Sequence, residues 1–136
     1  MLADLDDFKQ VNDRYGHPFG DELLKEFANA LRAAARDSDV AARWGGEEFA
    51  LILPGTGAEG GLRLAERVRE LVESRLVQAA DGSNVGITGS FGVASFPESE
   101  ELGELIAAAD SALYAAKREG KNRVVISAES KPPQIG

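Results

Sequence analysis

The sequence predicts an α/β domain (α+β sandwich) in which a central mixed five-stranded β-sheet is flanked by helices. Three observations support this class: short β-type runs alternate with long segments of helical periodicity, glycine-rich turns separate them, and 43% of the residues are hydrophobic. A chain of 136 residues suits one domain with one core. The predicted order of elements is β-α-α-β-β-α-β-α-β, with helices on one or both faces of the sheet.

The first third of the chain contains the end of a strand and two helices. Residues 1–4 have the pattern of a strand end, and residues 6–15 carry apolar side chains at helical spacing until Gly16 ends the helix. Residues 17–20 are predicted to form a turn. Residues 21–36 show a continuous apolar stripe with acidic residues in the first turn, which predicts a second, longer helix.

The rest of the chain begins with a predicted hairpin. The β-type runs 38–44 and 47–53 flank the pair Gly45 and Gly46, and a two-residue glycine loop between such runs is typical of a β-hairpin. After the hairpin we expect a helix with apolar residues from Leu62 to Leu76, a turn over 79–84 and a strand over 85–96. A helix from Leu102 to Ala116, closed by Gly120, and a strand over 123–127 follow. The last segment, 128–136, is expected to be a flexible polar tail.

The composition excludes several classes of protein. No run approaches the roughly 20 apolar residues of a membrane helix, and the N-terminus becomes acidic at Asp4, unlike a signal peptide. The absence of cysteine excludes disulfides, and a single histidine argues against a zinc site. A net charge of −8 repels nucleic acid and anionic lipid. We therefore expect a cytoplasmic domain that contacts neither nucleic acid nor a membrane.

Two acidic clusters indicate a site for a divalent cation. Asp4 closes the first strand and Glu47 opens the second arm of the hairpin, so their carboxylates meet at one sheet edge if these strands are neighbours. Such oxygen ligands suit Mg²⁺, which takes further ligands from substrate phosphates. Alternation along a strand sends Glu47 and Glu48 to different sides, so we expect different roles for them. The alternative is that the clusters are ordinary surface and capping acids.

Five segments together resemble the GGDEF family of diguanylate cyclases. They are, in order, DLDDFKQVNDRYGHPFGDELL, RDSD, GGEEF, TGSFGVA and ADSALYAAKREGKNRV. The resemblance runs from about Leu2 to Val125, so we predict a GGDEF domain over 1–127 and a tail over 128–136. It implies a fold like that of nucleotidyl cyclases and the polymerase palm. It also implies the condensation of two GTP into cyclic di-GMP with release of two pyrophosphates.

The resemblance implies a metal site and a catalytic base. Asp4 and Glu47 match the family's ligands for Mg²⁺ (or Mn²⁺), and the backbone carbonyl of Leu5 is a further expected ligand. Glu48 is expected either to coordinate the metal or to help deprotonate the attacking 3′-hydroxyl, and the sequence leaves both roles open. Asp4, Glu47 and Glu48 are therefore the expected catalytic residues.

The resemblance also implies a GTP site. Asn12 and Asp21 match the positions that read guanine, whose N1–H and N2–H₂ donors a carboxylate can accept together. The alternative is that both residues serve only at helix ends. The phosphates are expected at the Phe8 backbone amide and at three lysines. Those lysines are Lys9, Lys117 and Lys121.

The last two lysines are four residues apart at the end of the last long helix, so we expect them to point the same way. Lys121 replaces the family's usual arginine, which keeps the charge and loses the bidentate fork. The alternative is that lysines simply favour a helix C-terminus.

A separate inhibitory site for the product is implied by Arg36 and Asp39, which match the family's R-x-x-D motif, together with Arg67. The chemistry is consistent, because an arginine fork fits guanine O6 and N7. The alternative is a helix-end arginine followed by a polar turn.

The two-fold symmetric product implies a homodimer, since one domain supplies one bound GTP. The family's usual N-terminal helix has no counterpart in this sequence, so we expect exposed apolar surface. Three other functions are weighed: a catalytically weak or inactive receptor for cyclic di-GMP, a palm-type cyclase that uses ATP, and a purely structural dimerisation module.

Overall fold

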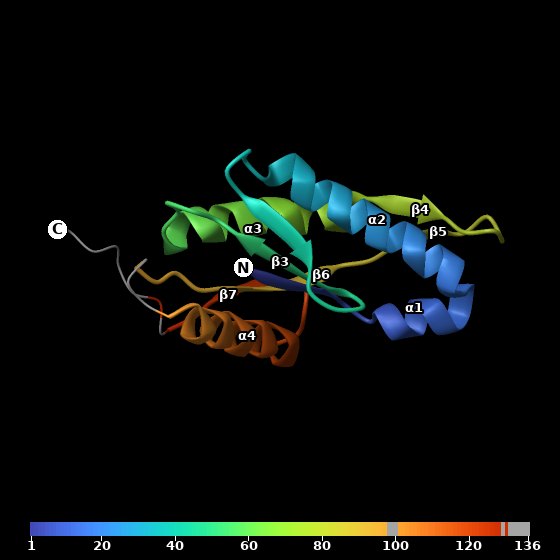
Figure 1. Cartoon of the computed structure of the whole chain (residues 1–136). Helices are drawn as coiled ribbons and strands as arrows, with labels where there is room; N and C mark the ends of the chain where they lie inside the picture. The colour runs from blue at the N-terminus through green and yellow to red at the C-terminus, as the bar shows by residue number, and fades with distance from the viewer. Residues whose placement is uncertain (98–100, 129, 131–136) are drawn as a thin grey trace.

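The structure is a computed structural model that describes residues 1–97, 101–128 and 130. Its centre is a five-stranded sheet with the strand order β2-β3-β1-β6-β7 (Figure 1). The pairs β2–β3, β1–β3 and β1–β6 are antiparallel and the pair β6–β7 is parallel, so the predicted mixed sheet is confirmed. These strands are β1 (Leu2–Leu5), β2 (Val40–Arg43), β3 (Glu48–Ile52), β6 (Gly89–Val93) and β7 (Val124–Ile126).

Helices cover both faces of this sheet, as Figure 1 shows. Phe27 of α2 and Val68 of α3 are buried against Phe91 of β6 in the larger core cluster. On the opposite face, Leu113 of α4 packs against Leu2 of β1. The helices are α1 (Phe8–Tyr15), α2 (His17–Ala34), α3 (Ala58–Ser74) and α4 (Leu102–Arg118), and none of the helices in the described ranges is long and apolar enough to span a bilayer.

Helix α4 lies unusually close to the sheet because β6 contains Gly92. A Cβ atom at this position would lie 2.2 Å from the Ala109 carbonyl oxygen and 2.3 Å from the Leu113 amide nitrogen. Only glycine permits that approach. Helix α4 contacts chiefly β1, β6 and β7. Val40 and Ile52, which pair across β2 and β3, are 56% and 53% exposed.

Three of the predicted elements differ from the structure. Residues 17–20 are not a turn, because α2 begins at His17 and accommodates a proline in its first turn, where no amide donor is needed. The helix expected to reach Leu76 ends at Ser74, and β4 (Leu76–Gln78) pairs with β5 (Asn84–Gly86) in a separate hairpin. The strand predicted over 85–96 is consequently divided into β5 and β6.

The tail predicted over 128–136 lies mostly outside the described residues. Only Ala128 and Ser130 of that segment are described.

Candidate active site

Three carboxyl groups meet where β1 lies beside the β2–β3 hairpin. Asp4 and Glu48 are register partners in the antiparallel pair of β1 and β3, so their side chains are neighbours on one face. Glu47 also lies close enough to Asp4 to raise the pKa of the Asp4 carboxyl group. The structure therefore brings together the acids that the sequence analysis selected as a cation site.

The turn that presents these acids differs from the predicted two-residue glycine turn. The Trp44 and Gly45 amides both donate to the Glu48 carbonyl, at 2.8 and 3.2 Å. Glu47 therefore lies in the loop and β3 begins at Glu48. Strand alternation does not apply to a loop residue, so it gives no reason to place the two glutamates on different sides.

Arg43 holds this loop from the end of β2, a role that the sequence analysis did not assign. Its Nε donates to the carbonyls of Gly45 and Gly46, both at 3.2 Å. Glycine at position 45 also leaves room for an acid, because a Cβ there would lie 3.2 Å from Glu48 Oε2.

The environment of Asp4 favours an added cation. Burial, together with the neighbouring charges of Glu47 and Glu48, raises the pKa of Asp4 to about 7 against the opposing effect of Lys117. Asp4 Oδ1 is buried without a hydrogen-bond partner, and the nearest ammonium, that of Lys117, lies 3.7 Å away. An unpartnered hard oxygen ligand among further acids fits Mg²⁺ or Mn²⁺.

The protein does not supply a complete ligand cage at this point. Among the residues that the structure describes, no three acidic or histidine side chains are arranged to hold a metal ion by themselves. Magnesium commonly keeps waters and takes ligands from substrate phosphates, so an incomplete set suits a site that binds the cation together with a nucleotide.

Asp6, two residues after Asp4, is the buried charge that the sequence analysis did not single out. It is 3% exposed and accepts hydrogen bonds from Thr88, Ser90, Lys117 and the backbone of Asn122. Burial alone would raise the pKa of Asp6, but these hydrogen bonds outweigh it and lower the pKa. The two-residue spacing of acids along an extended strand was the available signal.

Lys117 and Lys121 both reach the junction of β1 and α1. Lys117 Nζ donates to Asp6 Oδ1 at 2.8 Å and to the Leu5 carbonyl at 3.1 Å. Lys121 lies beyond the end of α4 and forms an ion pair with Asp7. Lys121 is therefore not part of the helix, but the two lysines point to adjacent acids, as the sequence led us to expect.

Two other predicted phosphate-site residues lie at the start of α1. Phe8 is the first residue of that helix, and its ring is buried in the core, so only its backbone can face a ligand. The amide groups of a helix N-terminus favour anions. Lys9 follows it and is exposed.

The predicted guanine-reading residues lie on two adjoining helices. Asn12 is on α1 and Asp21 is on α2. Asn12 Oδ1 is buried without a hydrogen-bond partner and lies against Gly20, where an added Cβ would come within 1.9 Å of it. Asp21 is exposed and lines a cavity of about 530 Å³ with Phe49 as one of its apolar walls. Gly20, which precedes Asp21 in the chain, thus leaves room for the free Asn12 acceptor.

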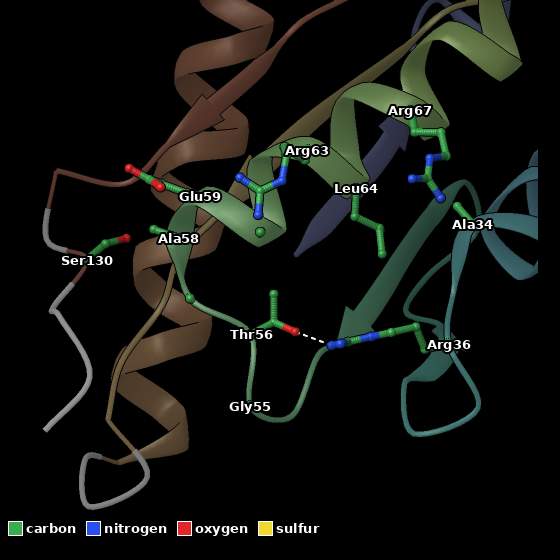
Figure 2. A pocket seen from close by; sticks show the side chains of 12 residues that line it. Ala34, Arg36, Gly55, Thr56, Ala58, Glu59, Arg63, Leu64, Arg67 and Ser130 are labelled. Carbon is green, nitrogen blue, oxygen red and sulfur yellow. Dashed lines mark hydrogen bonds between the residues drawn. The ribbon is translucent and has the colours of Figure 1, made fainter. Parts of the chain in front are cut away.

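Two of the three predicted product-site residues, Arg36 and Arg67, line a second cavity, of about 770 Å³ (Figure 2). Arg36 lines one side and donates to the Thr56 hydroxyl, while Arg63 and Arg67 project from successive turns of α3. Asp39 accepts from the Arg36 amide at 2.8 Å, and its Oδ1 is buried without a partner. Arg63 was not selected from the sequence, although it precedes Arg67 by one helical turn.

Comparison with known proteins gives a family match over most of the chain. The family model described as "Diguanylate cyclase, GGDEF domain" matches residues 1–123. Diguanylate cyclase A of Treponema denticola is 40% identical over 133 residues, which are 97% of this chain and 36% of that protein. Diguanylate cyclase DosC of Escherichia coli K12 is 41% identical over 124 residues, 91% of this chain and 27% of that protein. The chain thus spans about a third of the length of these relatives.

Solved structures agree with the sequence comparison. The GGDEF domain of DgcB from Caulobacter crescentus, in complex with c-di-GMP, has a TM-score of 0.85 and 36% identity, and the match covers 93% of this chain and 75% of that chain. The active GGEEF domain of a diguanylate cyclase from Vibrio cholerae has a TM-score of 0.85 and 32% identity, with coverage of 95% and 81%.

Proposed function

The chain belongs to the GGDEF family of diguanylate cyclases, and we propose that it condenses two GTP molecules into cyclic di-GMP and two pyrophosphates. The observation that carries this proposal is the meeting of Asp4, Glu47 and Glu48 beside the lysines at the β1–α1 junction. In each of two steps, a 3′-hydroxyl oxygen attacks the α-phosphorus of the other GTP. The bond from that phosphorus to the pyrophosphate oxygen breaks, and the hydroxyl proton passes to a base.

Asp4 and Glu47 would hold Mg²⁺ or Mn²⁺, with the Leu5 carbonyl and Glu48 as further ligands. The unpartnered Oδ1 of Asp4 supports this assignment. The Leu5 carbonyl already accepts from Lys117, so it has one lone pair left for a cation. When bound, the cation neutralises phosphate charge and orients the reacting groups. Glu48 is the candidate base if it does not bind the cation.

The remaining site residues bind the nucleotide. Asn12 and Asp21 would accept the donors of the guanine edge, and adenine, which lacks that pair of donors, would leave them unpaired at a cost in binding. The Phe8 amide would bind a phosphate oxygen, together with three ammonium groups. These belong to Lys9, Lys117 and Lys121.

Two-fold symmetry of the product requires two bound GTP molecules that face each other antiparallel. We propose that a homodimer of this domain in the cytoplasm provides them. Turnover then rises faster than linearly with protein concentration.

The larger cavity is proposed to bind the product and to inhibit the enzyme. Cyclic di-GMP carries two phosphodiester charges, and Arg36 and Arg67 offer two guanidinium groups across one hollow. Asp39 would accept from guanine as Arg36 donates to it. The complex of the Caulobacter domain with c-di-GMP supports a product site in this family.

The same cavity favours a second candidate function, that of a receptor that binds cyclic di-GMP without turnover. Incubation with GTP and Mg²⁺ followed by chromatography of the products separates the two, because a receptor forms no cyclic di-GMP. Calorimetry with cyclic di-GMP completes the experiment. Glu47→Ala is expected to stop turnover and keep product binding, whereas Arg36→Ala is expected to do the reverse; two variants that behave like wild type would refute these assignments.

A further inference from the structure

We propose that Asp6 is a positioning residue that fixes both lysines of the phosphate site at the acid-bearing end of β1. The inference rests on the proposed function, because it takes Lys117 and Lys121 as ligands of the triphosphate. Asp6 itself is 3% exposed, so it acts on the substrate only through the groups that it holds.

Every acceptor position of the Asp6 carboxylate is in use. Oδ1 accepts from Ser90 Oγ at 2.6 Å and from Lys117 Nζ at 2.8 Å. Oδ2 accepts from Thr88 Oγ1 at 2.7 Å and from the Asn122 amide at 2.9 Å. A carboxylate has about four lone-pair sites, so none remains for a metal or a phosphate-bound water. The Asp6 carboxylate therefore binds protein groups and does not bind the substrate or a metal directly.

Asp4 differs from Asp6 in this respect, although both carboxylates lie near the Lys117 ammonium. Its Oδ1 has no hydrogen-bond partner, while Lys117 Nζ lies 3.7 Å from it and 2.8 Å from Asp6 Oδ1. Asp6 thus keeps the ammonium away from direct contact with Asp4. Without the charge of Asp6, Lys117 would move onto Asp4 and neutralise the oxygen that a cation needs.

The second lysine depends on Asp6 through the backbone. Gly120, Lys121 and Asn122 have φ values of 129°, 66° and 45°, three successive left-handed residues of which two are not glycine. Such a segment is unfavourable unless its surroundings fix it. Asp6 accepts the Asn122 amide, and the Asn122 side chain contacts Glu73 of α3. This anchoring points Lys121 toward the start of α1.

The test compares two nucleotides by calorimetry on the full 136-residue chain with Mn²⁺. The first is α,β-methylene GTP, which carries the triphosphate and resists turnover, and the second is GMP. Asp6→Asn keeps the size of the side chain but removes the charge that positions the lysines. It is expected to lower the affinity for the triphosphate analogue about tenfold. Binding of GMP is expected to stay within about twofold, because its guanine site does not involve the lysines.

Asp110→Asn is the matched control, since it removes an exposed carboxylate from α4 and is expected to change neither affinity. If Asp6→Asn does not fold, Ser90→Ala is tested in its place. This substitution keeps the charges of Asp6 and Lys117 and removes one hydrogen-bond donor that fixes Asp6. Ser90→Ala is expected to lower the affinity for the triphosphate analogue about threefold and to leave the affinity for GMP unchanged.

Three results overturn the inference. Unchanged triphosphate affinity in the folded variant shows that Asp6 does not position the lysines. Equal weakening of both nucleotides shows a general structural role. A wild-type chain that binds neither nucleotide refutes the proposed function and the inference with it. If the wild type binds both nucleotides and only the variants give one of the two results above, the inference fails and the proposed function stands.

Discussion

The raised pKa of Asp4 predicts that divalent-cation binding depends on pH near neutrality. A cation competes with a proton for this carboxylate, and burial with two acidic neighbours raises its pKa to about 7. About a tenth of the groups are ionised one pH unit below that value and about nine-tenths one unit above it. Mn²⁺ affinity is therefore expected to rise about tenfold between pH 6 and pH 8, whereas an ordinary carboxylate is fully ionised over this range.

The assay is a Mn²⁺ titration in the absence of nucleotide, read from the fluorescence of Trp44. This is the chain's single tryptophan, and it is half exposed in the loop that carries Glu47. Asp4→Asn removes the titrating group and is expected to give weak affinity with no pH dependence over the same interval. A wild-type affinity that is constant from pH 6 to pH 8 would refute the assigned environment of Asp4. An Asp4→Asn variant whose Mn²⁺ affinity keeps the full pH dependence of the wild type would refute it as well.

Three further predictions concern separate parts of the molecule. Gly92→Ala is expected to destabilise the fold by about 3 kcal/mol in urea unfolding, because its Cβ would lie 2.2 Å from the Ala109 carbonyl oxygen. Gly20→Ala is expected to displace Asn12 and to lower the preference for GTP over ATP in a competition assay, with little change in phosphate affinity. Arg36→Ala is expected to abolish calorimetric binding of cyclic di-GMP while initial rates of turnover remain those of the wild type.

The sheet and its covering helices could be predicted because their signals are local. Phe27 and Val68 belong to apolar stripes at helical spacing, and both are buried as those stripes imply. The end of α3 could not be predicted in this way. Leu76 continues the spacing set by Val72, yet it is 64% exposed in β4. One apolar residue at the correct interval cannot distinguish a last helical turn from the first residue of a hairpin.

The candidate site was predictable to the extent that each residue's neighbours are close in sequence or in register. Asp4 and Glu47 follow from two strand ends, whereas the role of Asp6 depends on donors 82 to 116 positions away. The acids of DLDD look equivalent in the sequence. Only the tertiary structure shows that one is saturated with donors while another has an unpartnered oxygen.

This division of roles has a consequence for the charge balance of substrate binding. Lys117 is paired with Asp6, so Asp4, Glu47 and Glu48 form a negative cluster on a chain of net charge −8. Two like charges about 4 Å apart repel by about 4 kcal/mol at an effective dielectric constant near 20, and a triphosphate adds several such pairs. Under the proposed function, GTP is therefore expected to bind together with its cation.

Chelation of divalent cations is therefore expected to abolish binding of the GTP analogue. Binding of cyclic di-GMP at the cavity of Arg36 and Arg67 should persist, because three arginines and a single acid, Glu59, line that cavity. Calorimetry with both ligands in EDTA compares the two sites in a single sample. Equal loss at both sites would mean that the cation maintains the fold as a whole. Retained binding of the GTP analogue would mean that the acids at the hairpin do not face its phosphates.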